Sequence, residues 1–168
     1  LLLQMEIPED AVRAALVAAQ GKSVTSILNI APLTDAVERL APLADIVIAN
    51  ETEFARLSGR SAETLDAARA EVEALHGRTG QCLIVTLGGD GVLFAREGKV
   101  EHVPSLKIKP VDTVGAGDTF CGYLAQGLDA GMEFATAVRR AAVAGALACL
   151  KPGAQPSIPL SADVDARL

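Results

Sequence analysis

The stretch Cys82-Leu83-Ile84-Val85-Thr86-Leu87 is an almost unbroken apolar run. Such a run is typical of a strand that is buried on both faces of a parallel sheet. The glycine-rich segment 88–91 follows it and predicts a turn. Residues 92–95 and 100–103 are expected to form two further strands, joined by a turn at 97–99. The sequence therefore predicts an antiparallel hairpin after the buried strand.

Upstream of this strand, apolar runs alternate with helical patterns. Strands are expected at 1–5, 24–28 and 46–49, and helices at 9–20, 34–41, 51–57 and 63–76. Two alanine-rich helices are expected at 117–130 and 133–150. This alternation predicts an α/β fold with a mainly parallel sheet and helices on both sides. Ligands of such folds bind at the carboxyl ends of strands, which directs attention to the loops after Ala49 and Leu87.

The composition fits a single domain with a sizeable core, because half of the 168 residues are hydrophobic. The net charge of −6 argues against nucleic acid or an anionic membrane as the main partner. It permits a single nucleotide, which a few backbone amides can hold. The sequence shows neither an apolar span of transmembrane length nor a secretory signal.

The three cysteines are odd in number, and each lies inside an apolar run: Cys82, Cys121 and Cys149. We therefore expect free buried thiols in a reducing, cytoplasmic compartment. The two histidines have no partner at metal-ligand spacing, so no zinc site is expected. The opening run Leu1-Leu2-Leu3 is typical of a buried strand entered in mid-protein. An N-terminal portion is therefore expected to be missing.

The strongest chemical signal is the segment Asp112-Thr113-Val114-Gly115-Ala116-Gly117-Asp118-Thr119-Phe120. Its glycines allow a tight bend, and a helix then begins with unsatisfied N–H groups and the positive end of its dipole. Such an end favours an anion, typically a phosphate. Asp118 is placed where a carboxylate could meet that phosphate and a substrate hydroxyl. An equally good interpretation of the bend alone is that Asp118 caps the helix.

The segment from Val111 to Phe120 resembles the carbohydrate-kinase signature of the ribokinase family. Further segments resemble the family's motifs in the same order and at compatible spacing: 4–6, 29–32, 50–53, 86–91 and 153–157. The resemblance covers nearly the whole chain and implies a three-layer α/β/α ribokinase-like fold. The resemblance also implies that the family's N-terminal half, which supplies most sugar contacts, and its small β-sheet lid lie outside this chain.

The resemblance assigns the chemistry of phosphoryl transfer to the bend. Asp118 would contact both the sugar and the nucleotide, and would take the proton from the sugar's primary hydroxyl as it attacks the γ-phosphate of ATP. The amides of Gly115, Ala116 and Gly117 would stabilise the charge on the transferred phosphate.

Two further segments are expected to serve ATP and Mg²⁺. By resemblance, Asn50 and Glu53 organise the magnesium ion, its waters and the phosphates, whereas the residues alone favour a helix cap made by the same pair. The loop after the apolar strand would flank the phosphates and ribose of the nucleotide, although a plain turn is the simpler interpretation. That loop supplies Thr86, Gly88, Gly89, Asp90 and Gly91.

The remaining implied contacts are a cation site and a sugar contact. The family's monovalent-cation (K⁺) site, built largely from carbonyl oxygens, would fall on Asp112, Val114, Ala148, Lys151, Gly153 and Ser157. Without the resemblance, residues 153–157 would be an ordinary loop after a helix. Glu6 would contact the hydroxyls of the sugar, although most acids at strand ends are simply solvated.

The implied reaction is ATP-dependent phosphorylation of a sugar's primary hydroxyl, with D-ribose giving D-ribose 5-phosphate as the favoured case. Fructose, ketodeoxygluconate, deoxyribose and nucleosides are alternative substrates within the family. A third interpretation is a catalytically incomplete nucleotide-binding fragment. The resemblance also implies a homodimer for the complete enzyme. Ala141 and Ala142 replace the Asn or His that relatives often place near the adenine.

Overall fold

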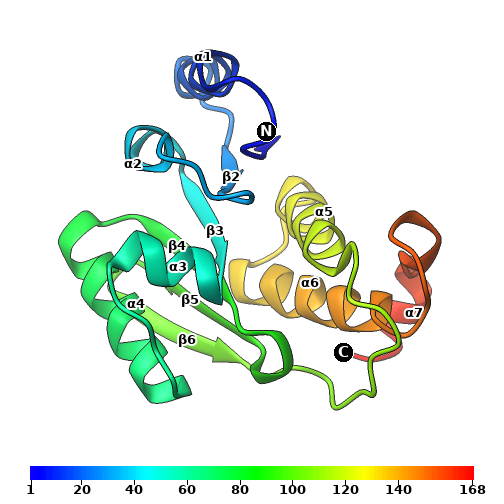
Figure 1. Cartoon of the computed structure of the whole chain (residues 1–168). Helices are drawn as coiled ribbons and strands as arrows, with labels where there is room; N and C mark the ends of the chain where they lie inside the picture. The colour runs from blue at the N-terminus through cyan, green and yellow to red at the C-terminus, as the bar shows by residue number, and fades with distance from the viewer. The chain divides into compact units, whose positions relative to one another are not determined.

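The computed structural model describes residues 1–168, which divide into two compact units. The sheet unit comprises residues 1–87 and 93–102, and the helical unit comprises residues 88–92 and 103–168. Figure 1 shows the course of the chain from the first strand to the last helix.

The sheet has six strands whose spatial order is their order in the sequence. They are β1 (Leu2–Leu3), β2 (Ile27–Asn29), β3 (Ile46–Asn50), β4 (Cys82–Thr86), β5 (Val92–Arg96) and β6 (Lys99–Val103). The first four strands are parallel, and Ile46 of β3 lies opposite Cys82 of β4. Short turns join β4, β5 and β6, and such short connections are possible between antiparallel neighbours but not between parallel ones. The α/β class and the mainly parallel sheet with a hairpin are therefore confirmed.

The helices of the sheet unit alternate with its parallel strands, as helical crossovers between such strands require. They are α1 (Glu9–Gln20), α2 (Val37–Leu40) with the 3₁₀ turn η1 (Ala41–Leu43), α3 (Glu51–Ser58) and α4 (Leu65–Thr79). Their apolar faces share one core with alternate strand residues such as Val47, Leu83 and Leu93. The intervening residues Ile48 and Ile84 are buried as well, so both faces of the central strands are covered, as the apolar run predicted.

His76 is a buried structural residue at the end of α4. Its Nδ1 lies 2.7 Å from the carbonyl oxygen of Gln81, and its Nε2 accepts a hydrogen bond of 2.9 Å from the amide of Gly98. Both ring nitrogens are thus used to hold the start of β4 and the β5–β6 turn against α4. No group of three or more His, Cys, Asp or Glu side chains in the structure is arranged to hold a metal ion.

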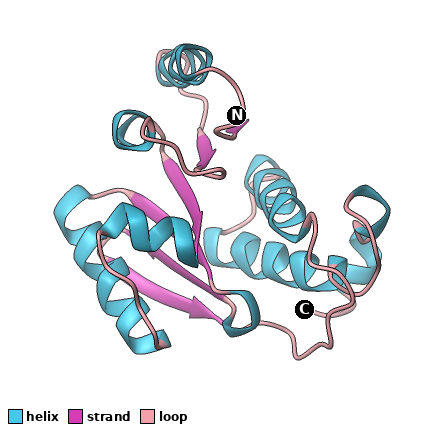
Figure 2. Cartoon of the chain, in the orientation of Figure 1, coloured by secondary structure: helices cyan, strands magenta, loops and turns pink.

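The helical unit contains α5 (Ala116–Asp129), α6 (Phe134–Ala148), the 3₁₀ turn η3 (Gln155–Ser157) and α7 (Ser161–Asp165). Glycines allow α5 and α6 to pack closely: a Cβ on Gly145 would lie 3.1 Å from the carbonyl oxygen of Ala116. A long irregular segment leads into α5 (Figure 2). No helix is both long and apolar enough to cross a membrane, and all three cysteines are free thiols.

Several predicted elements have different bounds in the structure. The first strand is shorter than residues 1–5, and the helix expected at 34–41 begins at Val37. The second strand begins at Ile27, because the amide and hydroxyl of Ser26 both donate to the Asp45 carboxylate at 2.7 Å. The segment 153–157, expected to be a loop, contains the 3₁₀ turn η3, and the short helix α7 that follows was not predicted.

Candidate nucleotide-binding and catalytic residues

The bend before α5 depends on Gly115. This residue is in the left-handed region (φ 78°, ψ 2°) and occupies the cap position of α5, where no side chain caps the helix. A Cβ here would approach Cα and Cβ of Ala154 to 3.0 Å, so both conformation and packing favour glycine. Asp118 is the third residue of α5 and is exposed. Asp118 is therefore not the cap residue, and that interpretation of the bend is wrong.

One amide of the bend is engaged within the bend itself. The Ala116 N–H donates to the carbonyl oxygen of Thr113 at 3.3 Å, a long bond that closes the bend on itself. The first turn of α5 has no side-chain acceptor at its cap, so an incoming anion would meet the positive end of the helix dipole.

Asp112 ties the bend to the segment that follows α6. One carboxylate oxygen accepts from the amide of Val114 at 3.0 Å, and the other accepts from the amide of Gly153 at 2.8 Å. These amides, that of Val114 first, lower the pKa of Asp112 below its usual value. In addition, the amide of Val111 donates to the carbonyl oxygen of Cys149 at 2.7 Å. The structure thus connects three of the residues expected at the cation site: Asp112, Val114 and Gly153.

The other expected cation-site residues lie on α6 and on the same following segment. Ser157 is buried and its hydroxyl donates to the carbonyl oxygen of Ala154 at 2.7 Å. The amide of Lys151 lies 3.5 Å from the carbonyl oxygen of Ala148. The cation site itself stays a prediction.

Asn50 and Glu53 form a reciprocal cap at the start of α3. The side-chain oxygen of Asn50 accepts from the amide of Glu53 at 2.9 Å, and Oε2 of Glu53 accepts from the amide of Asn50 at 2.9 Å. The cap interpretation is therefore confirmed. Glu53 is buried, and one of its two carboxylate oxygens is committed to the backbone. The role of this pair toward magnesium and ATP stays a prediction.

The loop after β4 is a 3₁₀ turn, η2 (Gly88–Asp90), as the simpler interpretation expected. Gly91 is required by packing, since its φ is 95° and a Cβ would lie 2.1 Å from the carbonyl oxygen of Val103. Gly88 and Gly89 are exposed, and a Cβ on either would meet nothing within 4 Å. The hydroxyl of Thr86 lies 3.5 Å from the carbonyl oxygen of Ala49. Nucleotide contact by this loop and by the exposed Asp90 stays a prediction.

Glu6 follows β1 and is exposed, as expected of a solvated acid at a strand end. A cavity of about 310 Å³ lies nearby in the sheet unit, bordered by Met5 and Ile7. The same cavity is bordered by Glu9, whose pKa is lowered to about 2 by hydrogen bonds from Arg39. The sugar contact of Glu6 stays a prediction.

A second cavity, of about 660 Å³, lies in the helical unit and reaches Asp118. Apart from Thr119, which belongs to the quoted segment 112–120, its remaining lining residues did not feature in the sequence predictions: Gly122, Tyr123, Gln126, Met132, Arg140, Ile158, Ser161 and Asp165. The Thr119 hydroxyl is buried without a hydrogen-bond partner. A signal for Arg140 was present, because helical spacing from Ala137 and Ala144 puts this charge on the buried stripe of α6.

Comparison with known proteins gives a consistent result. Residues 2–160 match the model of the pfkB family of carbohydrate kinases. The chain is 34% identical over 159 residues to a ribokinase of Haemophilus influenzae, covering 95% of this chain and 52% of that protein. It is 31% identical over 160 residues to a deoxyribokinase of Salmonella typhi, covering 95% of this chain and 52% of that protein.

A solved structure has the same fold. The Arabidopsis thaliana ribokinase complexed with ribose and ATP superposes with a TM-score of 0.89 at 32% identity, covering 98% of this chain and 54% of that one. The chain therefore belongs to the pfkB family of carbohydrate kinases, as the motifs predicted. It spans about half the length of the relatives that it matches.

Proposed function

We propose that the protein containing this chain transfers the γ-phosphoryl group of ATP to the primary hydroxyl of a sugar, with Asp118 as the base. The observation that carries this proposal is the geometry of the bend. An exposed carboxylate lies in the first turn of a helix whose start has no side-chain cap. A carboxylate there can accept the hydroxyl proton while the helix end stabilises the phosphate charge.

The amides of Gly115 and Gly117, and that of Ala116 after release from Thr113, would bind the phosphate oxygens. Phosphoryl transfer needs positioning and charge stabilisation more than covalent chemistry, so a few fixed amides and one base suffice. Exposed Gly88, Gly89 and Asp90 are candidates for contacts with the rest of the nucleotide.

The residues at the start of α3 fit magnesium, which would supply positive charge to neutralise the phosphates. Mg²⁺ keeps several waters and needs few protein ligands, and Glu53 has a second carboxylate oxygen beyond the one held by Asn50. A monovalent cation would use the carbonyl oxygens around Asp112. The Asp112 carboxylate fits a supporting role, because backbone amides already engage both of its oxygens.

Ribose is the proposed sugar. Two relatives with nearly equal coverage of this chain are a ribokinase and a deoxyribokinase, so 2-deoxyribose is the second candidate. The proposal includes a cytoplasmic location, a homodimeric complete enzyme and no sugar kinase activity of these 168 residues alone.

The decisive experiment is Asp118→Asn in the full-length protein, with sugar-dependent ADP formation as the readout. We expect kcat to fall by about a hundredfold or more, with little change in ATP affinity. The asparagine side chain has the same shape as aspartate but cannot act as a base. Asp129→Asn, at the exposed far end of the same helix, is the matched control. Near-normal turnover of Asp118→Asn would refute the base assignment. Ribose and 2-deoxyribose are compared in the same assay. Absence of ribose turnover would refute ribose as the substrate.

A further inference from the structure

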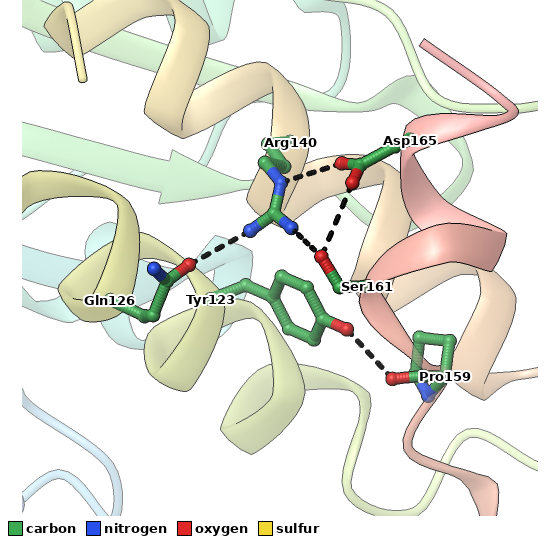
Figure 3. Close-up of polar contacts among 6 residues, drawn as sticks. All are labelled: Tyr123, Gln126, Arg140, Pro159, Ser161 and Asp165. Atoms are coloured by element: carbon green, nitrogen blue, oxygen red, sulfur yellow. Dashed lines mark hydrogen bonds and ion pairs between the residues drawn. The ribbon is translucent and has the colours of Figure 1, made fainter. Parts of the chain in front are cut away.

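Arg140 is a buried cation that joins three elements of the helical unit. It lies on α6 with 5% of its surface exposed. Its Nε donates to Oδ1 of Asp165 at 2.9 Å, and its terminal nitrogens donate to the side-chain oxygens of Gln126 and Ser161 at 2.9 and 2.5 Å (Figure 3). One guanidinium thus connects α5, α6 and α7.

Tyr123 completes this arrangement. The Arg140 guanidinium lies 5.0 Å from the centre of its ring, within the range of a cation–π contact. The phenol hydroxyl donates to the carbonyl oxygen of Pro159 at 2.7 Å, just before α7 (Figure 3). We call Tyr123, Gln126, Arg140, Ser161 and Asp165 the Arg140 clamp.

The clamp makes the docking of α7 and the burial of Arg140 depend on each other. Burying a guanidinium is costly unless its charge is paired and its donors are satisfied. Asp165 supplies the charge and Ser161 supplies a further acceptor, and both belong to α7. Arg140 in turn holds the pKa of Asp165 below its usual value. Detaching α7 would leave the Arg140 charge without its carboxylate.

The chain between α6 and α7 is attached to the candidate catalytic bend at its other end. The carbonyl oxygen of Cys149 accepts from Val111, and the amide of Gly153 donates to Asp112. Ala154 packs so closely on Gly115 that a Cβ on residue 115 would lie only 3.0 Å from Cα and Cβ of Ala154. Residues 149–165 therefore run from the bend to the Arg140 clamp, held at both ends.

We propose that Arg140 is a positioning residue for the phosphate-binding bend. By anchoring α7, it keeps residues 149–154 pressed against residues 111–115, and so holds Gly115 in the conformation that leaves the start of α5 open. The catalytic meaning of this role rests on the proposed function, whereas the mechanical coupling does not. A purely structural Arg140 would hold α7 and leave the bend unchanged.

Amide hydrogen exchange on the 168-residue chain tests the coupling directly. In Arg140→Gln we expect exchange about tenfold faster or more at Val164 of α7 and also at Val111 and Gly153. Arg139→Gln is the matched control, because Arg139 is exposed and adjacent on the same helix. Faster exchange at Val164 with unchanged exchange at Val111 and Gly153 would overturn the proposal.

The chain carries its own reporter of the clamp, since Tyr123 is its single tyrosine and it has no tryptophan. Near-ultraviolet circular dichroism of Tyr123 shows whether the clamp is closed in each variant. If Arg140→Gln does not fold, Asp165→Asn removes the partner's charge at a half-exposed position. We expect the same pattern of exchange in Asp165→Asn, with a smaller increase. An altered Tyr123 signal with no change at Val111 and Gly153 in Asp165→Asn would equally overturn the proposal.

ADP binding separates this inference from the proposed function. Where the wild-type chain binds ADP, we expect Arg140→Gln to weaken binding by about tenfold and Arg139→Gln to leave it unchanged. Unchanged affinity together with unchanged exchange at Val111 and Gly153 contradicts the positioning role and leaves the kinase proposal standing. A wild-type chain that binds no ADP counts against nucleotide binding by this chain, and exchange at Val111 and Gly153 then decides the positioning role alone.

Discussion

The starts of α3 and α5 solve the same physical problem in opposite ways. Each helix begins with N–H groups that have no partner within the helix. At α3 the side chains of Asn50 and Glu53 close the end through two reciprocal hydrogen bonds. At α5 the cap position holds Gly115, which has no side chain, so the cap residue makes no side-chain hydrogen bond to the first turn. The start of α3 is thus capped by the side chains of its own first residues, whereas the cap residue of α5 offers no side-chain acceptor.

The two helix starts therefore differ in what they contribute: the capped start of α3 stabilises the fold, and the start of α5 remains available for binding an anion. A side-chain cap contributes about 1 kcal/mol to a helix, and glycine at the cap position gives up only a few tenths of that. The α5 start therefore keeps its bend at little cost in stability while leaving its dipole end available to a phosphate. We expect Gly115→Ala to lower both nucleotide binding and stability, and we expect Asn50→Ala to lower stability through loss of the cap.

Gly115→Ala should have the larger effect. An alanine here would be strained in the left-handed backbone conformation, and its Cβ would lie only 3.0 Å from Ala154, so the bend must shift. We expect a loss of about 1–3 kcal/mol in the free energy of unfolding and ADP affinity lowered by about tenfold or more. Denaturant unfolding and calorimetric titration of the 168-residue chain measure the two effects.

The matched control for Gly115→Ala is Gly131→Ala. Gly131 is also left-handed, with φ 76°, but a Cβ there would meet nothing within 4 Å. This variant should lose only about 1 kcal/mol from backbone strain and should bind ADP normally. Equal ADP affinities in the two variants would show that the shape of the bend does not govern binding.

Asn50→Ala should have a smaller effect, on stability. It removes the acceptor for the Glu53 amide and half of the reciprocal cap, so we expect unfolding to require about 1–2 kcal/mol less. Thr64→Ala is the comparison, because Thr64 caps α4 through a single hydrogen bond of 3.2 Å at an exposed site. Urea denaturation should show the larger loss for Asn50→Ala. An equal or smaller loss would mean that the reciprocal cap adds nothing.

The same contrast explains what the sequence could predict. Caps and bends are local, so Asn50, Glu53 and the glycines around Ala116 could be recognised from residue type and spacing alone. The parallel sheet followed from apolar runs alternating with helical patterns. The family followed from ordered motifs, which carry more information than any single glycine pattern.

The features that were missed depend on contacts between distant residues. The start of β2 is set by Asp45, which lies 19 residues after Ser26. The Asp45 carboxylate accepts from the Ser26 amide, so this amide is not available for pairing between strands. The helix α7 is too short to show a periodic pattern, and Arg140 holds it in place from 25 residues away. The role of the buried Arg140 became clear only once its partners on α5 and α7 were known.

The most direct test of the open start of α5 is amide NMR of the ¹⁵N-labelled 168-residue chain during titration with ADP and Mg²⁺. The account predicts that the amides of Gly115, Ala116 and Gly117 shift together and saturably, with the Ala116 amide released from its bond to Thr113. Saturable binding that leaves these three amides unmoved would contradict it.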